Sequence, residues 1–365
     1  MEACGQFTGT GFPCAEETTI ALVMPVRRVT PVRPNRPGIV EFDPALAIAD
    51  NSSVALAHLR AVNAKYRRRI WPEPFDRTTH RLRIGDARDL SWLPDASVHL
   101  VVTSPPYFTL KEYAKRDGQM GEIADYETFL SELDRVWKEC ARVLVPGGRI
   151  CCVVGDVCVP RKKGGRHYVL PLHADIQVRA RSTGLDCLTP ILWTKIANGA
   201  NEAEGNGAGF YGKPYQPGAV VKNDVEYILF LRKGGEYRKP DPTQKMLSMM
   251  NRAEMRKWLH SRWADVPGAS TRTGHPAPFP QEIAQRLIRL FSFAGDIVLD
   301  PFVGTGSTMV AAIETGRNSI GVDIEPMYAE FAAKRIGKAV AAVRDHTCGA
   351  NKPEIVALEG DRESA

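Results

Sequence analysis

The stretch Ile297-Val298-Leu299-Asp300-Pro301-Phe302-Val303-Gly304-Thr305-Gly306-Ser307-Thr308 decides the fold of this chain. It predicts a buried strand over 297–300, then a glycine-rich turn, then an alanine-rich helix that begins directly after the turn. Glycines let the backbone approach a ligand closely, and the first turn of a helix offers N–H groups that have no partner within the helix. The unit is typical of the first crossover in a nucleotide-binding α/β sheet.

The residues in and after this turn indicate which nucleotide it could bind. The turn lacks the Gly-Lys-Ser/Thr end of a phosphate-binding P-loop, which argues against ATP hydrolysis. It also lacks the third spaced glycine of dinucleotide-binding proteins. The next predicted strand, 318–324, contains Asp323, and a carboxylate at this place can accept hydrogen bonds from both ribose hydroxyls of an adenosine.

A second motif follows an apolar strand predicted over 98–102, where the chain reads Thr103-Ser104-Pro105-Pro106-Tyr107. Two prolines fix φ and remove two backbone donors, so that rigid carbonyls are left at the end of the strand. Ser104 adds an acceptor and Tyr107 adds a flat aromatic face. This combination suits a planar heterocycle that carries an exocyclic amine.

Strands and helices alternate through most of the 365 residues. Apolar strands are predicted over 81–86, 98–104, 149–156, 187–195 and 225–233, and helices over 125–144 and 170–182. This pattern predicts an α/β fold with a doubly wound, mostly parallel sheet. A composition of 44% hydrophobic and 25% charged residues excludes a disordered, collagenous or membrane-embedded chain.

The two motifs together resemble the DNA amino-methyltransferases that use S-adenosylmethionine, over about 81–340. The 300–306 turn resembles the cofactor motif of that family, and 103–107 resembles its catalytic motif. The order, with the catalytic motif first, resembles the permuted beta class. Two shorter matches are Gly85-Asp86-Ala87, which resembles a loop at the cofactor adenine, and the stretch from His275 to Pro280. The resemblance implies a Rossmann-like sheet of seven strands, one of them antiparallel.

The resemblance also assigns site residues. The catalytic residues are Ser104, Pro105, Pro106 and Tyr107, and the cofactor-binding residues are Asp86, His275, Pro276, Asp300, Phe302, Gly304, Gly306 and Asp323. Composition and the pattern of strands and helices divide the chain into a basic, proline-rich arm predicted to be disordered (1–43), a helical extension (44–80), a catalytic half (81–235), a helical insert for target recognition (236–272), a cofactor half (273–345) and a flexible tail (346–365). The resemblance supplies the names of the catalytic and cofactor halves.

The reaction implied is methyl transfer to the amine of a flipped base in double-stranded DNA. Family members with serine before Pro-Pro usually modify cytosine N4, which we therefore favour, and adenine N6 is the alternative. The residues themselves leave two further classes open: an adenosine-binding module without chemistry, and methylation of RNA or of a protein glutamine. No Pro-Cys dipeptide occurs within 81–340, where the resemblance lies, so methylation of cytosine carbon 5 is disfavoured; the Pro13-Cys14 pair belongs to the N-terminal arm.

DNA contacts are expected from the insert, where one helix predicted over 245–263 carries Arg252, Arg256, Lys257 and Arg262. Arg252 and Arg256 share a face, whereas Met255, Trp258 and Leu259 form another face that would pack on the sheet. Lys111, just past the catalytic motif, is a further candidate for phosphate contact. The formal charge of +6 permits a polyanionic partner.

The remaining expectations concern cysteines, location and partners. The eight cysteines form no CxxC pair, so no metal site is predicted. Neither a signal peptide nor an apolar run of membrane-spanning length is seen, which favours a cytoplasmic, nucleoid-associated protein that does not engage a membrane. The resemblance makes a homodimer and a cognate restriction endonuclease possible partners.

Overall fold

The structure is a computed structural model, and it describes residues 71, 73–108, 116, 118–194, 223–250, 252–269, 279–346 and 352–360. The expected N-terminal arm (1–43) and most of the helical extension (44–80) lie outside these residues. No helix within the described ranges has both the length and the apolar character needed to cross a membrane.

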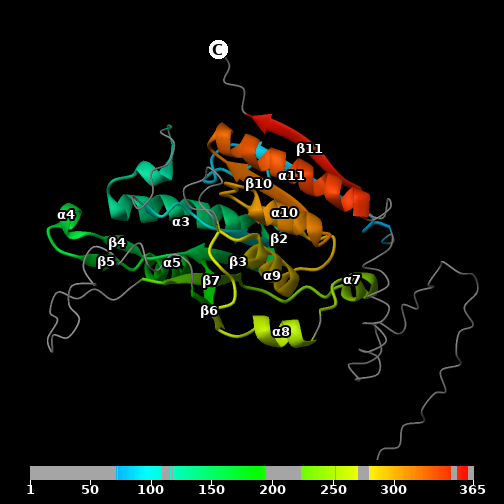
Figure 1. The fold of residues 1–365 in the computed structure, drawn as a ribbon, viewed down its shortest axis with the longest axis horizontal. Coiled ribbons are helices and arrows are strands. Elements are labelled where there is room, and N and C mark those ends of the chain that lie inside the picture. The colour runs from blue at the N-terminus through cyan, green and yellow to red at the C-terminus, as the bar shows by residue number, and fades with distance from the viewer. Residues whose placement is uncertain are drawn as a thin grey trace, which may run out of the picture. The chain divides into compact units, whose positions relative to one another are not determined.

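One sheet runs through the described part of the chain, with neighbouring strands in the order β11-β1-β10-β9-β2-β3-β7-β6-β8 (Figure 1). The strands are β1 (Arg77–Ile84), β2 (Val98–Thr103), β3 (Leu144–Val154), β6 (Leu185–Thr194), β7 (Val225–Lys233), β8 (Arg262–Trp263), β9 (Ile297–Asp300), β10 (Asn318–Asp323) and β11 (Lys352–Gly360). Only β7 is antiparallel to its neighbours. The predicted mostly parallel sheet with one antiparallel strand is therefore confirmed, and β11 and β8 extend the seven predicted strands at the two edges.

Helices cover both faces of this sheet, as a doubly wound fold requires. Helices α3 (Tyr126–Val143) and α5 (Leu172–Ala180) share one core with the β2 residue Val101. Helices α9 (Gln281–Phe291) and α10 (Ser307–Glu314) share the other core with the adjacent residues Leu100 and Val102. Successive side chains of a strand point to opposite faces, so β2 is apolar throughout because both of its faces are buried.

The C-terminal tail is the first correction to the sequence analysis. The structure places β11 at Lys352–Gly360, inside the region predicted as a flexible tail, and pairs it in parallel with β1. Without β11, β1 would be an edge strand with a row of unpaired backbone groups. Helix α11 (Pro326–His346) leads the chain back to this edge. Pairing with the edge explains a strand that its own sequence pattern did not reveal.

The insert is the second correction, because it does not form one helix over 245–263. Helix α7 (Pro242–Leu247) begins with a capping box between Asp241 and Gln244, and a separate helix α8 spans Arg252–Trp258. Trp258 and Trp263 are both buried against α9 and the sheet. Residues five apart on a helix point about 140° apart, so one continuous helix could not bury both indoles on the same side. The chain instead leaves the helix and adds β8 beside β6.

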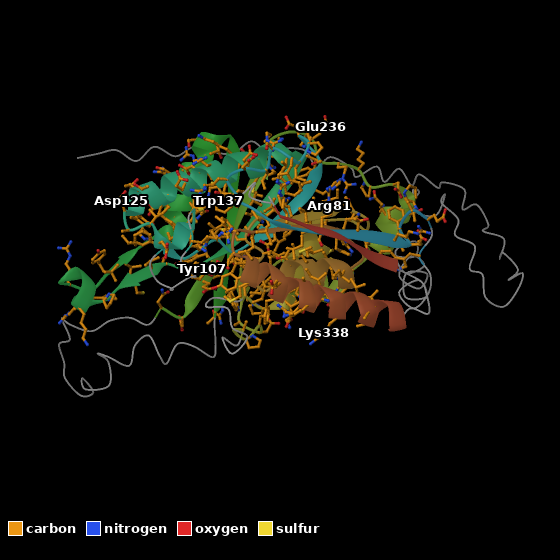
Figure 2. All side chains as sticks on the ribbon, turned by 90° about the horizontal axis from the view of Figure 1, so that it is seen from above. Arg81, Tyr107, Asp125, Trp137, Glu236 and Lys338 are labelled. Atoms are coloured by element: carbon orange, nitrogen blue, oxygen red, sulfur yellow. The ribbon has the colours of Figure 1, made fainter. Side chains whose placement is uncertain are left out.

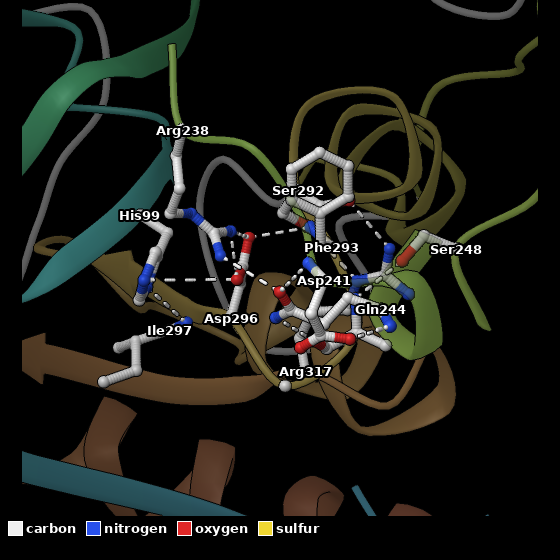
Figure 3. Close-up of polar contacts among 12 residues, drawn as sticks. His99, Arg238, Asp241, Gln244, Ser248, Ser292, Phe293, Asp296, Ile297 and Arg317 are labelled. Carbon is white, nitrogen blue, oxygen red and sulfur yellow. Dashed lines mark hydrogen bonds and ion pairs between the residues drawn. The ribbon is translucent and has the colours of Figure 1, made fainter. Parts of the chain in front are cut away.

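A polar network ties the start of the insert to the sheet (Figure 3). The carboxylate of Asp296, only 3% exposed, pairs with the guanidinium of Arg238 and accepts a hydrogen bond from the Phe293 N–H at 2.7 Å. His99 Nε2 lies 4.0 Å from the same carboxylate, and Ser248 Oγ accepts from the Ala294 N–H at 2.8 Å. These contacts fix the insert at the amino-terminal ends of β2 and β9.

Candidate active site

The glycine loop, residues 301–306, joins β9 to α10 and has the local geometry predicted for it. Gly304 and Gly306 adopt φ values of 46° and 77°, in the left-handed region that side chains disfavour. A Cβ on Gly306 would also lie 3.2 Å from the Cβ of Ala332 on α11. Arg335 Nη1 donates to the Thr305 carbonyl at 2.6 Å, which holds the loop against α11.

Asp323 lies at the carboxyl end of β10, beside the glycine loop. One of its oxygens accepts from the Gly304 N–H at 2.8 Å and the other accepts from the Glu325 N–H at 2.9 Å. The residue is only 9% exposed, and burial raises the pKa of its carboxyl from 3.8 to about 6. A carboxylate has about four acceptor positions, so each oxygen can still accept from a ligand.

Asp300, at the end of β9, was predicted to bind the cofactor. It is fully buried and does not line the pocket described below. Its Oδ1 accepts from the Thr103 hydroxyl at 2.7 Å and from the Phe302 N–H at 3.1 Å, while within the described ranges Oδ2 has no hydrogen-bond partner. Burial raises the pKa of Asp300 to about 6. The side chain thus joins the glycine loop to the residue that precedes Ser104.

The proline loop, residues 104–107, follows β2 at the same carboxyl edge of the sheet. Ser104 Oγ donates to the Tyr107 hydroxyl at 3.1 Å, and Pro105 and Pro106 are buried. Tyr107, labelled in Figure 2, is only 6% exposed and belongs to the core on the α3 side. The tyrosine therefore orients Ser104 from behind, and the structure does not show the open aromatic face that the sequence analysis expected.

Asp86 follows β1 at this edge and is held by a neighbour. Arg88 Nε donates to both carboxylate oxygens of Asp86 at 2.9 Å, and Arg88 Nη1 pairs with Glu132. Arg88 Nη2 also donates to the Gly118 carbonyl at 3.1 Å. These contacts raise the pKa of Arg88, with the Asp86 hydrogen bond as the main cause, and keep the guanidinium charged.

One pocket brings most of these residues together, with about 590 Å³ of space that is partly open to solvent. Its lining consists of Asp86, Ala87, Ser104, Pro105, Pro106, Gly118, Gln119, Met120, Phe302, Gly304, Asp323, Ile324 and Tyr328. The sequence analysis missed the segment 118–120, Ile324 and Tyr328. Ile324 and Tyr328 follow the strand that ends with Asp323, so their nearness to the site could have been inferred, whereas the 118–120 segment carries no motif.

Several predicted residues fall elsewhere. His275, Pro276 and Lys111 lie outside the described residues. Arg252, Arg256, Lys257 and Arg262 are exposed and do not line the pocket, and Lys257 Nζ pairs with Asp265 at 2.7 Å. Met255 and Leu259, expected to pack on the sheet, are 43% and 60% exposed, so of that predicted face Trp258 alone is buried. No group of side chains suited to a metal ion occurs among the described residues.

Comparison with known proteins gives matches over most of the chain. Residues 98–335 match the N6_N4_Mtase family model, described as DNA methylase. The chain is 38% identical over 289 residues to the Type II methyltransferase M.MjaI of Methanocaldococcus jannaschii, covering 71% of this chain and 92% of that protein. It is 32% identical over 283 residues to the Type II methyltransferase M.MthZI of Methanothermobacter thermautotrophicus, covering 72% and 78%.

A solved structure is similar as well. The crystal structure of TTHA0409 from Thermus thermophilus, in complex with S-adenosyl-L-methionine, superposes with a TM-score of 0.62 at 47% sequence identity. The match covers 77% of this chain and 100% of that one.

Proposed function

The chain belongs to the DNA methylase family that its residues 98–335 match, and we propose that it transfers a methyl group from S-adenosylmethionine to N4 of cytosine in duplex DNA. One observation carries the proposal: the proline loop and the glycine loop line the same pocket. Ser104, Pro105 and Pro106 contribute to it together with Gly304 and Asp323. The residue proposed to accept from the amine and the carboxylate proposed to bind the adenosine therefore line one pocket.

The pocket fits S-adenosylmethionine, a cationic adenosine derivative. Asp323 offers a buried carboxylate to the ribose hydroxyls, and Phe302 and Ile324 offer apolar surface to the adenine. Asp86 lies at the same pocket, oriented by Arg88, as an acceptor for the adenine amine. The cofactor supplies an electrophilic methyl group on a sulfonium centre. The complex of the similar TTHA0409 protein supports the choice of cofactor.

The protein groups act mainly by positioning the target amine. In cytosine and adenine the lone pair of this nitrogen is delocalised into the ring. The Ser104 hydroxyl donates a hydrogen bond to the Tyr107 hydroxyl, so the lone pairs of Ser104 Oγ are free to accept from the amine. The rigid Pro105 carbonyl is the second acceptor. Two such hydrogen bonds favour tetrahedral geometry at nitrogen and aim its lone pair, and the base must leave the duplex to reach them.

Serine at position 104 supports cytosine N4 over adenine N6, because a serine before Pro-Pro is usual in relatives of this family that modify cytosine. The test is mass spectrometry of nucleosides from DNA treated with the purified protein and S-adenosylmethionine. N4-methylcytosine is expected, and Ser104→Ala is the matched control, which should yield less of it in the same time. N6-methyladenine as the sole product would overturn the choice of base, and no methylated nucleoside would overturn the proposed function.

Arg252 and Arg256, exposed on α8, are the proposed base readers in the DNA target. Arg262, on β8, and Lys257 are secondary candidates for DNA contact. Arg262 lies outside α8, and Lys257 is already paired with Asp265. Arg252→Ala and Arg256→Ala should weaken DNA binding and relax the target sequence without changing cofactor affinity. A homodimer and a cognate restriction endonuclease stay predictions from the resemblance, and a cytoplasmic, nucleoid-associated location stays a prediction from the sequence.

A further inference from the structure

A small two-stranded hairpin projects from the edge of the sheet that carries the proline loop. It consists of β4 (Val157–Val159), the single-turn helix α4 (Arg161–Gly164) and β5 (Tyr168–Leu170), and we call residues 157–170 the basic hairpin. It follows β3 after two residues, and β3 pairs in parallel with β2, with Thr103 opposite Cys152. The basic hairpin therefore starts beside the strand end from which Ser104 extends (Figure 1).

The base of the basic hairpin is fixed to the core. Val157 is buried in the core on the α3 side. Asp156 Oδ1, just before β4, lies 2.6 Å from His173 Nδ1 and accepts from the His173 N–H at 3.2 Å, just after β5. The His173 ring stacks on Tyr227 of β7 with centroids 3.6 Å apart. Because both ends are held, the hairpin has a defined direction from the catalytic edge.

The turn of the basic hairpin is also well defined. A Cβ on Gly164 would come within 2.7 Å of the Tyr168 ring and 3.0 Å of Val159, so glycine is needed for the ring to close over the turn. Gly165 follows with φ of 69°, a left-handed residue that ends α4. The turn therefore presents its charged side chains from a fixed backbone.

The charge of the basic hairpin has one sign. Residues 157–170 contain Arg161, Lys162, Lys163 and Arg166 and no aspartate or glutamate. Arg161, Lys162 and Arg166 are exposed, and none of them forms an ion pair with another residue in the described ranges. Elsewhere in the catalytic half, arginines such as Arg88, Arg142 and Arg179 are paired with carboxylates. Such an uncompensated group of cations suits a polyanion.

We propose that the basic hairpin contacts the phosphate backbone of duplex DNA beside the base that is methylated. The inference rests on the proposed function and adds a second DNA contact, separate from α8. A strand rises about 3.3 Å per residue, so the turn at Arg161 lies roughly 13 Å from the start of the hairpin at Val157, which equals about four base pairs at 3.4 Å each. The cations then meet phosphates that flank the flipped nucleotide, where they hold the duplex in register without reading sequence.

The test compares two double variants that each remove two positive charges. Arg161→Gln/Arg166→Gln removes them from the basic hairpin, and Lys334→Gln/Lys338→Gln removes them from exposed positions on α11, which lies well away from the hairpin in both Figures 1 and 2. Binding to a fluorescent 30-base-pair duplex of random sequence is measured at several salt concentrations. All of the substituted side chains are exposed, so both variants should fold.

For the hairpin variant, the negative slope of log K against log salt should become shallower by about 1.8. Its affinity for the duplex at 0.1 M salt should fall by up to about sixty-fold. The α11 variant should keep the slope of the natural chain, and both variants should keep its affinity for S-adenosylmethionine. A hairpin variant with an unchanged slope would overturn the inference, as would a changed oligomeric state with an unchanged slope. If the natural chain methylates DNA in the mass-spectrometric test described above, such a result refutes the hairpin contact alone, whereas a natural chain without methylation there refutes the proposed function.

Discussion

Replacing Asp323 by asparagine separates two effects of the buried carboxylate: its destabilisation of the folded protein and its contribution to binding S-adenosylmethionine. The rise of the pKa of this carboxyl from 3.8 to about 6 corresponds to about 3 kcal/mol against folding at neutral pH. Between these pH values the folded protein keeps a proton that the unfolded chain releases. The free energy of unfolding therefore falls as the pH rises through this window and is constant above it.

Asparagine removes this destabilisation at pH 7 but accepts fewer hydrogen bonds from the neighbouring backbone. Its amide has one oxygen, so one of the N–H groups of Gly304 and Glu325 loses its acceptor, at a cost of about 1–3 kcal/mol. The two effects nearly cancel, and Asp323→Asn should be at least as stable as the natural chain. Its affinity for S-adenosylmethionine should fall by about 1.5–3 kcal/mol, or roughly 10- to 150-fold, because a charge-assisted acceptor is lost.

The pH dependence gives an independent readout by calorimetry. If the ionised form of Asp323 binds the ribose, the dissociation constant of the natural chain at pH 5 should be about elevenfold higher than at pH 8, with a midpoint near pH 6. Asp323→Asn should show no such midpoint. Unchanged affinity in the folded variant would refute the assignment of Asp323. A midpoint near pH 6 that persists in the variant would instead assign the titration to Asp300, whose pKa is also about 6.

Three further predictions concern the chemistry and the stability of the fold. Ser104→Ala should lower kcat by at least about tenfold, and Tyr107→Phe by only a few-fold, with unchanged affinity for S-adenosylmethionine in both, because the tyrosine acts only through the serine; loss of cofactor binding in either would contradict this. Arg238→Ala should lower the free energy of unfolding in urea by roughly 3 kcal/mol, since it leaves the buried Asp296 carboxylate without its cation; a loss below about 1 kcal/mol would show that the pair is not needed. Gly306→Ala should destabilise the protein by about 1–3 kcal/mol in the same assay, because alanine is strained at a φ of 77°, and an unchanged midpoint would count against that backbone conformation.

The parts of the fold that the sequence predicted well depend on local patterns. Apolar strands that end in glycine or proline turns, such as those before Ser104 and Gly304, can be predicted from local sequence. Proline fixes φ, and glycine allows the positive φ that the turn needs. The order of these motifs along the chain, seen through a family resemblance, then predicted the central sheet. The strands β8 and β11 could not be predicted in this way, since each is defined by the free edge that it joins and hardly by its own residues.

Side-chain partners were harder to predict than the backbone. Asp86 was predicted from its motif, but its pairing with Arg88 and the link from there to Glu132 on α3 depend on packing between distant segments. Tyr107 was expected at the surface of the site because it follows two prolines, yet its ring enters the core and only its hydroxyl reaches Ser104. Motifs identify which residues lie at the edge of the sheet, whereas packing decides which way each side chain faces.

The bond between Thr103 and Asp300 explains how two motifs that lie 197 residues apart can act as one site. β2 and β9 are neighbours in the sheet, with Val101 opposite Leu299, so the residues that follow them must lie side by side whatever their order along the chain. A fully buried carboxyl with one oxygen lacking a hydrogen-bond partner within the described ranges is unfavourable for stability alone. The carboxyl has a second consequence: Asp300, the last residue of β9, holds the Thr103 hydroxyl at the start of the glycine loop. One hydrogen bond therefore joins the strand that leads into the glycine loop to the residue that precedes Ser104. The permuted order of the motifs leaves this link intact, because the link depends on strand neighbours and not on the connection between them.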